Sequence, residues 1–267
     1  MAPSQVVLIT GANTGIGYEA LKAFAAASEA YHILVGSRSA EKGNEAIAAL
    51  QKEFPQTASK FTLVQVDIDT DESINKAFET VSGITNHIDA LVNNAGWAPD
   101  PYINSSKTGT RDGWIAGYNT NVVGTHIMTQ VFMPLLLKSS TPRLLFVTSG
   151  MSTLGGHVGK HKRPRQYLPA GWPKQDPRNN VAYRSSKAAL NMMMLEWERA
   201  MKNDGVKVWC LSPGMLATNL GGIGPDKLRE IGAEDPSVGG IFIKDVVEGK
   251  RDEDTGKVIM RDGIQPW

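Results

Sequence analysis

Residues 6–17 read VVLITGANTGIG, in which an apolar run leads into a loop with three glycines. The apolar run predicts a buried strand, and the helical period after the loop predicts a helix. Gly11, Gly15 and Gly17 have no Cβ atom, which permits a tight turn and a close backbone approach to a pyrophosphate at the positive helix terminus. An ordinary glycine-rich turn is the alternative interpretation. The stretch therefore predicts a strand, a phosphate-binding loop and a helix at the start of an α/β fold.

The rest of the chain repeats this alternation of short apolar runs and longer stretches of helical period. The predicted strands cover residues 5–10, 31–36, 61–66, 88–93, 142–148, 205–211 and 257–260. The predicted helices cover residues 15–28, 39–53, 71–82, 111–138, 179–203 and 236–248. Such an alternation is typical of βαβ units around a buried parallel sheet. Because their connections are right-handed, we expect a doubly wound parallel sheet with helices on both faces.

We expect a single domain over residues 1–267, because no change in composition divides the chain. Ligands of doubly wound sheets bind at the carboxyl ends of the strands. Two stretches, 97–110 and 150–180, are rich in Gly, Pro and polar or basic residues and interrupt the regular alternation. Both follow predicted strands, so both are expected to overhang the ligand-binding edge.

Composition excludes several classes of partner. With 28 basic and 27 acidic residues, the formal net charge of +1 argues against nucleic acid or an anionic membrane and favours a small molecule as partner. Cys210 is the only cysteine, so no intramolecular disulfide or thiolate metal cluster is expected, and its apolar surroundings predict a buried strand residue. The first residues show no basic leader, and no apolar span reaches about 18 residues, so we expect a soluble cytoplasmic protein.

Residues 183–187 read YRSSK, and on a helix this spacing places the side chains of Tyr183 and Lys187 on one face. A free tyrosine has a pKa near ~10, and a fixed cation nearby favours the phenolate and lowers that pKa. The pair therefore suits proton transfer at neutral pH. Alone it is weak evidence, because the same spacing is also found by chance on exposed helix faces.

Further motifs follow in an order that resembles the short-chain dehydrogenases/reductases, particularly their carbonyl-reductase-like members. The motifs are residues 10–17, Asp67, the run NNAG at 93–96, Asn121, Ser149, Tyr183, Lys187 and the run PGMLAT at 213–218. The resemblance covers nearly the whole chain and implies a Rossmann fold. It also implies an oxidoreductase that reduces a ketone or aldehyde, or oxidises the corresponding alcohol, with a nicotinamide cofactor.

The end of the second predicted strand indicates which cofactor is preferred. An acidic residue there would bind the ribose 2′-hydroxyl of NAD, whereas a 2′-phosphate needs a cation. The strand ends in Ser37 and Arg38 with no carboxylate, which predicts NADP(H) in preference to NAD(H). The alternative is that Arg38 is only a solvated loop charge. Many NADP-preferring relatives also carry a basic residue in the glycine loop, where this chain has Asn13 and Thr14.

The resemblance also implies a full set of cofactor-binding residues. It places Asp67 and Ile68 beside the adenine, Asn94 and Gly96 near the ribose and pyrophosphate, and Thr218, with Leu216 and Met215, at the nicotinamide. The complete set is Gly11, Asn13, Thr14, Gly15, Ile16, Gly17, Ser37, Arg38, Asp67, Ile68, Asn94, Ala95, Gly96, Tyr183, Lys187, Pro213, Gly214, Leu216 and Thr218.

Four residues have catalytic roles in the family pattern. It implies Tyr183 as the acid, Ser149 as the donor that positions the substrate oxygen, Lys187 as the group that lowers the Tyr183 pKa and holds ribose hydroxyls, and Asn121 as the anchor of a proton-relay water. Asn119 is an alternative to Asn121, which on a simpler interpretation only bonds a neighbouring backbone. Thr148 and Ser152 are alternatives to Ser149.

Ser149 and Tyr183 lie 34 positions apart, about twenty more than in the shortest relatives. The basic and aromatic residues of the 150–180 insertion predict a lid over a sizeable, aromatic or anionic substrate, and a solvated surface excursion is the alternative. His157 and His161 have i, i+4 spacing, but no helix is expected among the nearby glycines and no third ligand is close. We therefore predict no metal site.

The remaining alternatives concern assembly and reaction class. Met192–Met194 and Trp197 suggest core or subunit-interface packing on the helix of Tyr183, so a homodimer or homotetramer is possible. Residues 147–151 read VTSGM, which lacks the Gly-x-Ser-x-Gly elbow of a hydrolase. A chain with this scaffold could also bind NADP in a regulatory role, or catalyse a non-redox cyclisation or isomerisation. The complete set of proton-transfer residues argues against both.

Overall fold

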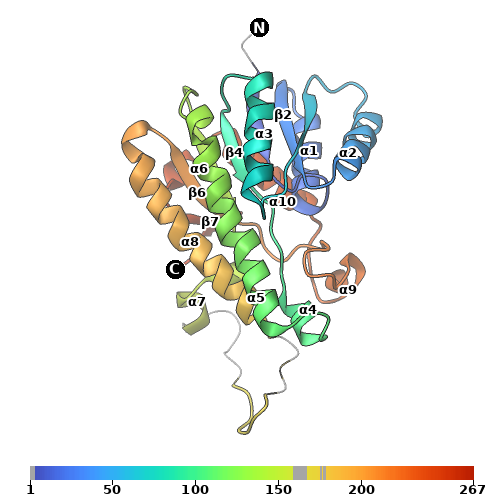
Figure 1. The fold of residues 1–267 in the computed structure, drawn as a ribbon, viewed down its shortest axis with the longest axis vertical. Helices are drawn as coiled ribbons and strands as arrows, with labels where there is room; N and C mark the ends of the chain where they lie inside the picture. The colour runs from blue at the N-terminus through green and yellow to red at the C-terminus, as the bar shows by residue number, and fades with distance from the viewer. Residues whose placement is uncertain (1–3, 159–166, 175, 177–178) are drawn as a thin grey trace.

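The computed structural model describes residues 4–158, 167–174, 176 and 179–267. These residues form one eight-stranded sheet in the order β3-β2-β1-β4-β5-β6-β7-β8 (Figure 1). The strands are β1 (Gln5–Ile9), β2 (Tyr31–Ser37), β3 (Lys60–Gln65), β4 (Ala90–Asn93), β5 (Arg143–Val147), β6 (Lys207–Ser212), β7 (Val258–Met260) and β8 (Gly263–Ile264). Every neighbouring pair is parallel except β7 and β8. The predicted doubly wound α/β fold is confirmed.

Helices cover both faces of the sheet. The α-helices are α1 (Gly15–Ala25), α2 (Ala40–Glu53), α3 (Asp71–Ile84), α4 (Asp100–Asn104), α5 (Thr110–Tyr118), α6 (Thr125–Leu136), α7 (Gly155–Val158), α8 (Val181–Met201), α9 (Pro225–Glu230) and α10 (Ser237–Val247). Successive strand residues point to opposite faces, and they divide the core into two layers. Phe132 of α6 and Leu190 of α8 belong to one layer, while Phe24 of α1 and Phe242 of α10 belong to the other.

The structure differs from the predicted elements in four places. The predicted helix 111–138 consists of α5, a π-helical segment at Asn119–Gly124, and α6. The π segment lies against the loop after β3, where a Cβ on Gly124 would lie 1.9 Å from the Ile68 carbonyl oxygen. The stretch 97–110, expected to interrupt the regular alternation, contains α4, and the stretch 219–235, for which no element was predicted, contains α9. The antiparallel β8 was not predicted, because two residues are too few to show a period.

The carboxyl ends of β1, β4, β5 and β6 carry the loops that contain the predicted motifs. Because these four strands are neighbours in the sheet, the glycine loop, the NNAG turn at 93–96, Ser149 and the 213–218 segment meet at one edge. The strand order reverses beside β1, which is the position where sheets of this kind bind ligands. In Figure 1 the short helices α4, α7 and α9 lie at the end of the molecule opposite the amino terminus. Cys210 is buried in β6, as expected.

Candidate active site

The glycine loop between β1 and α1 is shaped by two residues in the left-handed region and by one close approach. Gly11 has φ +62° and Gly15 has φ +57°, which a residue with a side chain rarely adopts. A Cβ on Gly17 would lie 2.5 Å from the Gly11 carbonyl oxygen and 2.6 Å from Asn94 Nδ2. The first turn of α1 therefore packs directly against the loop, and the first N–H groups of a helix have no partner within it.

The NNAG turn supports the glycine loop from β4. Asn94 Nδ2 donates to the carbonyl oxygens of Thr10 and Gly11 at 2.9 and 3.1 Å. The Thr10 hydroxyl oxygen accepts hydrogen bonds from the backbone N–H groups of Asn94 and Ala95, both at 3.0 Å. Asn94 and Ala95, predicted near the cofactor, thus hold the loop in shape from beneath it.

The 213–218 segment after β6 closes the other side of the glycine loop. A Cβ on Gly15 would lie 3.7 Å from the side chain of Thr218. Leu216 and Ile16 both pack against Gly239 of α10. A Cβ on that glycine would lie 2.6 Å from the Leu216 side chain and 3.2 Å from the Ile16 side chain. The segment turns at Pro213 and Gly214, where φ is +103° at the glycine. These predicted cofactor residues are therefore neighbours in space, although about 200 positions separate them in sequence.

At the end of β2, Ser37 and Arg38 differ in their surroundings. Ser37 is buried and its hydroxyl donates to the Ser39 carbonyl oxygen at 2.8 Å. Arg38 is exposed, and no carboxylate among the described residues pairs with its guanidinium. Asp67 accepts a hydrogen bond from the Asp69 N–H at 3.1 Å, and Ile68 beside it is buried. Within the described ranges, a cation without a carboxylate partner thus lies at the position where the sequence predicts a 2′-phosphate.

The predicted catalytic side chains come together where β5 ends and α8 begins. Tyr183 and Lys187 lie in the first two turns of α8 and are only 7% and 3% exposed. Lys187 Nζ lies 5.8 Å from the centre of the Tyr183 ring and donates to the Val147 carbonyl oxygen at 2.9 Å. The Ser149 side chain lies close enough to the phenol of Tyr183 to lower its pKa by hydrogen bonding. The two hydroxyls can therefore act on one substrate atom.

Asn121 completes this cluster from the π-helical segment, a type of distortion that is frequent at functional sites. The fully buried amide exchanges two hydrogen bonds with the Trp97 backbone, at 2.8 and 2.9 Å, and donates to the Ser186 hydroxyl at 2.9 Å. A Cβ on Gly96 would lie 3.1 Å from Asn121 Oδ1 and 3.3 Å from Lys187 Nζ. Asn121 is therefore next to the lysine.

The alternative residues for these positions have other partners. Asn119 donates to the Asp69 carbonyl oxygen at 3.1 Å. Thr148 donates to Asn191 Oδ1 at 2.7 Å, and Ser152 donates to the Ser149 carbonyl oxygen at 2.6 Å. The structure thus favours Asn121 over Asn119. It also places Thr148 and Ser152 in a buried network that supports Ser149.

Two residues of this supporting network carry no sequence signal. Gln265, near the end of the chain, donates to the Ser152 hydroxyl at 3.0 Å and to the Ser149 carbonyl oxygen at 3.3 Å. Asn191 of α8 donates to Ser152 at 2.9 Å. Gln265 lies far from any recognised motif, and Asn191, one turn after Lys187, belongs to none, so only the three-dimensional arrangement reveals their role.

Burial shifts the pKa of both Tyr183 and Lys187 in the free chain. Loss of water raises the pKa of Tyr183 to about 12, although its hydrogen bond with Ser149 acts in the opposite direction. Burial lowers the pKa of Lys187 to about 8. The pKa of Tyr183 in the free chain is therefore raised rather than lowered, and burial is the largest cause. Spacing along a helix does not reveal how completely water is excluded.

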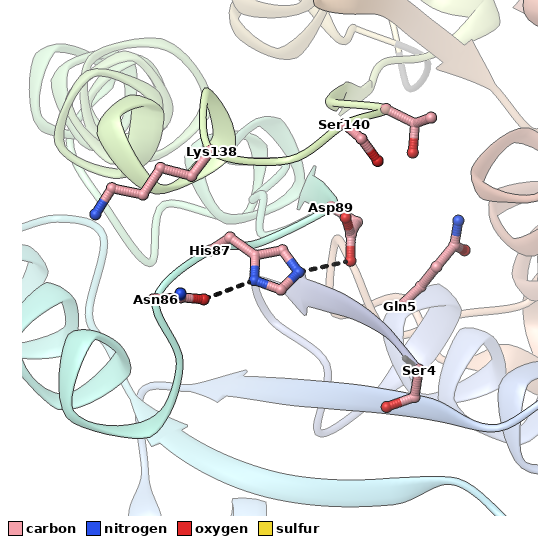
Figure 2. Close-up of a pocket in the computed structure, with 8 residues that line it drawn as sticks. Ser4, Gln5, Asn86, His87, Asp89, Lys138 and Ser140 are labelled. Carbon is pink, nitrogen blue, oxygen red and sulfur yellow. Dashed lines mark hydrogen bonds and ion pairs between the residues drawn. The ribbon is translucent and has the colours of Figure 1, made fainter. Parts of the chain in front are cut away.

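A separate hollow of about 420 Å³ lies at the opposite edge of the sheet (Figure 2). His87 Nε2 lies 3.4 Å from Asp89, whose carboxylate accepts hydrogen bonds from the Val6 N–H at 2.8 Å and from the Ser139 hydroxyl at 2.5 Å. These contacts join the starts of β1, β4 and β5. The described residues hold no group of three His, Cys, Asp or Glu side chains that could bind a metal ion, and His161 lies outside them.

The chain matches the short chain dehydrogenase family over residues 5–160 and 173–225, and it belongs to this family. The predicted family is thereby confirmed. Its members are oxidoreductases that use a nicotinamide cofactor and act on small molecules, so the chain is a short-chain oxidoreductase. Among the residues that the structure describes, no helix has both the length and the apolar character needed to cross a membrane.

Two relatives match the chain over almost its whole length. It is 42% identical over 270 residues to the short-chain dehydrogenase/reductase tropE of Talaromyces stipitatus. This match covers 100% of this chain and 99% of the relative. It is 45% identical over 277 residues to the short-chain dehydrogenase/reductase eupG of a Phoma species, with coverage of 99% and 98%.

Solved structures support the fold. The carbonyl reductase Sniffer of D. melanogaster has a TM-score of 0.74 at 20% identity, and the match covers 99% of this chain and 100% of that one. The NADPH-bound carbonyl reductase from chicken fatty liver has a TM-score of 0.73 at 23% identity, with 99% of both chains covered.

Gly17→Ala tests the close packing of the phosphate-binding loop. Because the added Cβ would overlap the Gly11 carbonyl oxygen, we expect the loop to shift, with a loss of about 1–3 kcal/mol in stability and weaker NADPH binding. Gly83→Ala in α3 is the matched control, since its Cβ would meet no atom within 4 Å. Thermal unfolding and NADPH titration measure both effects. Equal behaviour of the two variants would contradict this description of the loop.

Proposed function

We propose that the chain is an NADP(H)-dependent short-chain reductase of ketones or aldehydes, which can also oxidise the corresponding alcohols. The observation that supports this most directly is the cluster of Tyr183, Ser149, Lys187 and Asn121 at the carboxyl edge of the sheet, in which Tyr183, Lys187 and Asn121 are buried and Ser149 is half-buried. A protein that only binds a dinucleotide has no need of a phenol, a hydroxyl and an ammonium arranged around one buried point.

The two hydroxyls serve the developing charge of the substrate. The nicotinamide ring of the cofactor supplies hydride chemistry when it is bound. During reduction negative charge grows on the carbonyl oxygen, so hydrogen bonds to that oxygen strengthen in the transition state. Ser149 donates one such bond, and Tyr183 gives its phenolic proton to the same oxygen as the general acid. In the oxidation direction Tyr183 takes the proton back from the alcohol.

Lys187 assists Tyr183 through its charge. With a pKa of about 8, its amine is mostly protonated at neutral pH. Positive charge 5.8 Å from the ring centre stabilises the phenolate that remains after the proton has left. In the absence of water this attraction is strong, since the local dielectric is low. The position of Asn121 beside Gly96 and Lys187 suits an anchor for the water that returns a proton to this pair.

The cofactor residues fit a dinucleotide with a 2′-phosphate. Gly11 and Gly15 give the loop its left-handed turns, and the missing Cβ of Gly17 lets the loop pack closely against α1. A pyrophosphate would bind at the first turn of α1, where the N–H groups have no partner within the helix. Arg38, exposed and without a carboxylate partner among the described residues, would bind the 2′-phosphate. Lys187 would hold ribose hydroxyls, and Thr218 and Leu216 would lie at the nicotinamide end. The NADPH bound to the carbonyl reductase from chicken fatty liver is consistent with this preference.

We further propose a sizeable apolar, aromatic substrate. Leu154, Tyr167 and Trp172 of the 150–180 insertion expose between 69% and 87% of their surface. Met215 and Ile223, which follow β6, are about half exposed. The basic residues 160–165 of the insertion lie outside the described residues, so an anionic substrate and the lid role stay predictions. The single domain, the cytoplasmic location and the homodimer or homotetramer stay predictions as well.

Tyr183→Phe is the direct test of the proton-transfer role. NADPH consumption with a panel of aromatic ketones, aldehydes and quinones should fall by at least about 10²-fold, because the assigned general acid is lost. NADPH binding should be unchanged. Tyr31→Phe is the matched control, since this buried phenol donates to Glu248 at 3.0 Å on the amino side of the sheet.

Two outcomes would contradict the proposal. Retained turnover in Tyr183→Phe would refute the assigned role of the phenol. Tight NADPH binding by the wild-type chain without turnover across the panel would favour a regulatory role or a non-redox isomerisation or cyclisation.

Arg38→Ala tests the cofactor preference. Loss of a charge-assisted bond to the 2′-phosphate should weaken NADPH binding by about ten- to a hundredfold and leave NADH binding nearly unchanged. Arg199→Ala, at the far end of α8, removes an exposed guanidinium paired with Glu196 and should change neither affinity. Fluorescence titration of both cofactors measures the difference. An equal loss for NADPH and NADH would contradict the 2′-phosphate assignment.

A further inference from the structure

The start of the catalytic helix is held by a carboxylate from a distant part of the chain. Asp100, the first residue of α4, is 3% exposed. Its Oδ1 accepts a hydrogen bond from the Ala182 N–H at 3.0 Å, and its Oδ2 accepts one from the Tyr183 N–H at 2.8 Å. Both oxygens of one buried carboxylate are therefore committed to the first turn of α8, and one of the two donors belongs to Tyr183 itself.

Helix geometry explains why these contacts matter. The first N–H groups of a helix have no partner within the helix, and the helix dipole favours negative charge at that end. Asp100 satisfies two of these groups at once. No Lys, Arg or His side chain is paired with Asp100 in the part of the chain that the structure describes, so the helix terminus is the positive group it faces.

The segment that carries Asp100 is stiff and is attached at several points. Pro99 and Pro101 flank Asp100, and their rings restrict the backbone on either side of it. Asn104, at the end of α4, donates to the Asn179 carbonyl oxygen at 3.0 Å, just before α8. At the other end, the backbone of Trp97 exchanges two hydrogen bonds with Asn121. Segment 97–104 thus connects the π-helical segment to the start of α8.

We propose that Asp100 is a positioning residue for proton transfer. Its two hydrogen bonds fix the position of the Tyr183 backbone along the axis of α8 and its rotation about that axis. The phenol is thereby placed within reach of both Ser149 and the substrate oxygen. This inference rests on the proposed function, because it concerns the geometry of the assigned acid. It adds a residue outside the predicted catalytic set, and it gives the loop after β4 a role in the chemical step.

Asp100→Asn tests the role with little change in size. The asparagine keeps one acceptor oxygen but turns an NH₂ group toward a backbone N–H, so one of the two contacts is lost. Asp89→Asn is the matched control. Asp89 is also a buried carboxylate that accepts a backbone N–H, from Val6 at 2.8 Å, but it lies at the opposite edge of the sheet.

Four measurements separate positioning from general destabilisation. Hydrogen exchange at the amides of Ala182 and Tyr183 should become faster in Asp100→Asn, and this measurement does not depend on enzyme activity. The dissociation constant of NADPH should stay within about twofold, and kcat should fall by about ten- to a hundredfold with a smaller change in KM. The solvent deuterium isotope effect on single-turnover NADPH oxidation should increase, because proton transfer becomes slower. Asp89→Asn should show none of these changes.

Each result bears on the proposal. Faster exchange at residues 182–183 with unchanged kcat and isotope effect would overturn it and leave Asp100 a structural cap. Equal losses of kcat in both variants would also overturn it, since loss of stability would then explain them. If Asp100→Asn does not fold, Asp100→Ser keeps a smaller acceptor and should show the same pattern to a lesser degree. Failure of the proposed function would appear separately, as a wild-type chain without turnover or an active Tyr183→Phe variant.

Discussion

The exclusion of water from one phenol and one ammonium is the constraint on which the rest of the site depends. Burial opposes the charged form of both groups, so the pKa of Tyr183 rises to about 12 and that of Lys187 falls to about 8 in the free chain. The protein compensates with fixed contacts. The Val147 carbonyl oxygen holds the amine, and the Ser149 hydroxyl holds the phenol. A neutral phenol beside a cation is a competent proton donor, and little reorganisation is needed when charge develops next to it.

The sheet brings these groups together because its neighbouring strands end at the same edge. The lysine comes from α8, the serine from the end of β5, and the asparagine from a π-helical segment that packs against the loop after β3. Gly96 is the point where these elements meet, since a Cβ there would lie within 3.3 Å of both Asn121 and Lys187. A similar close approach at Gly17 joins the glycine loop to the turn after β4. Glycine is required at positions 17 and 96 because a Cβ atom there would crowd the neighbouring atoms.

Much of the fold was predictable from the sequence, because buried parallel strands read as short apolar runs and each motif follows one of them. Tyr183 and Lys187 were predictable as a pair, since helical spacing alone places them together. Asp100 and Gln265 were not, because their partners lie 82 or more positions away and neither residue has a local pattern. The direction of the Tyr183 pKa was also missed. It depends on packing by side chains from several elements, and a spacing of four residues carries no information on that packing.

The central claim is that the cluster of Tyr183, Ser149, Lys187 and Asn121 is the place where hydride and proton reach one carbonyl group. A crystal structure of the chain with NADP⁺ and a ketone tests it most directly. The account predicts the nicotinamide ring beside Tyr183 and Ser149, the ketone oxygen within hydrogen-bonding distance of both hydroxyls, and the 2′-phosphate at Arg38. A Tyr183 hydroxyl turned away from the ring, or a dinucleotide bound in the hollow of His87 and Asp89, would contradict it.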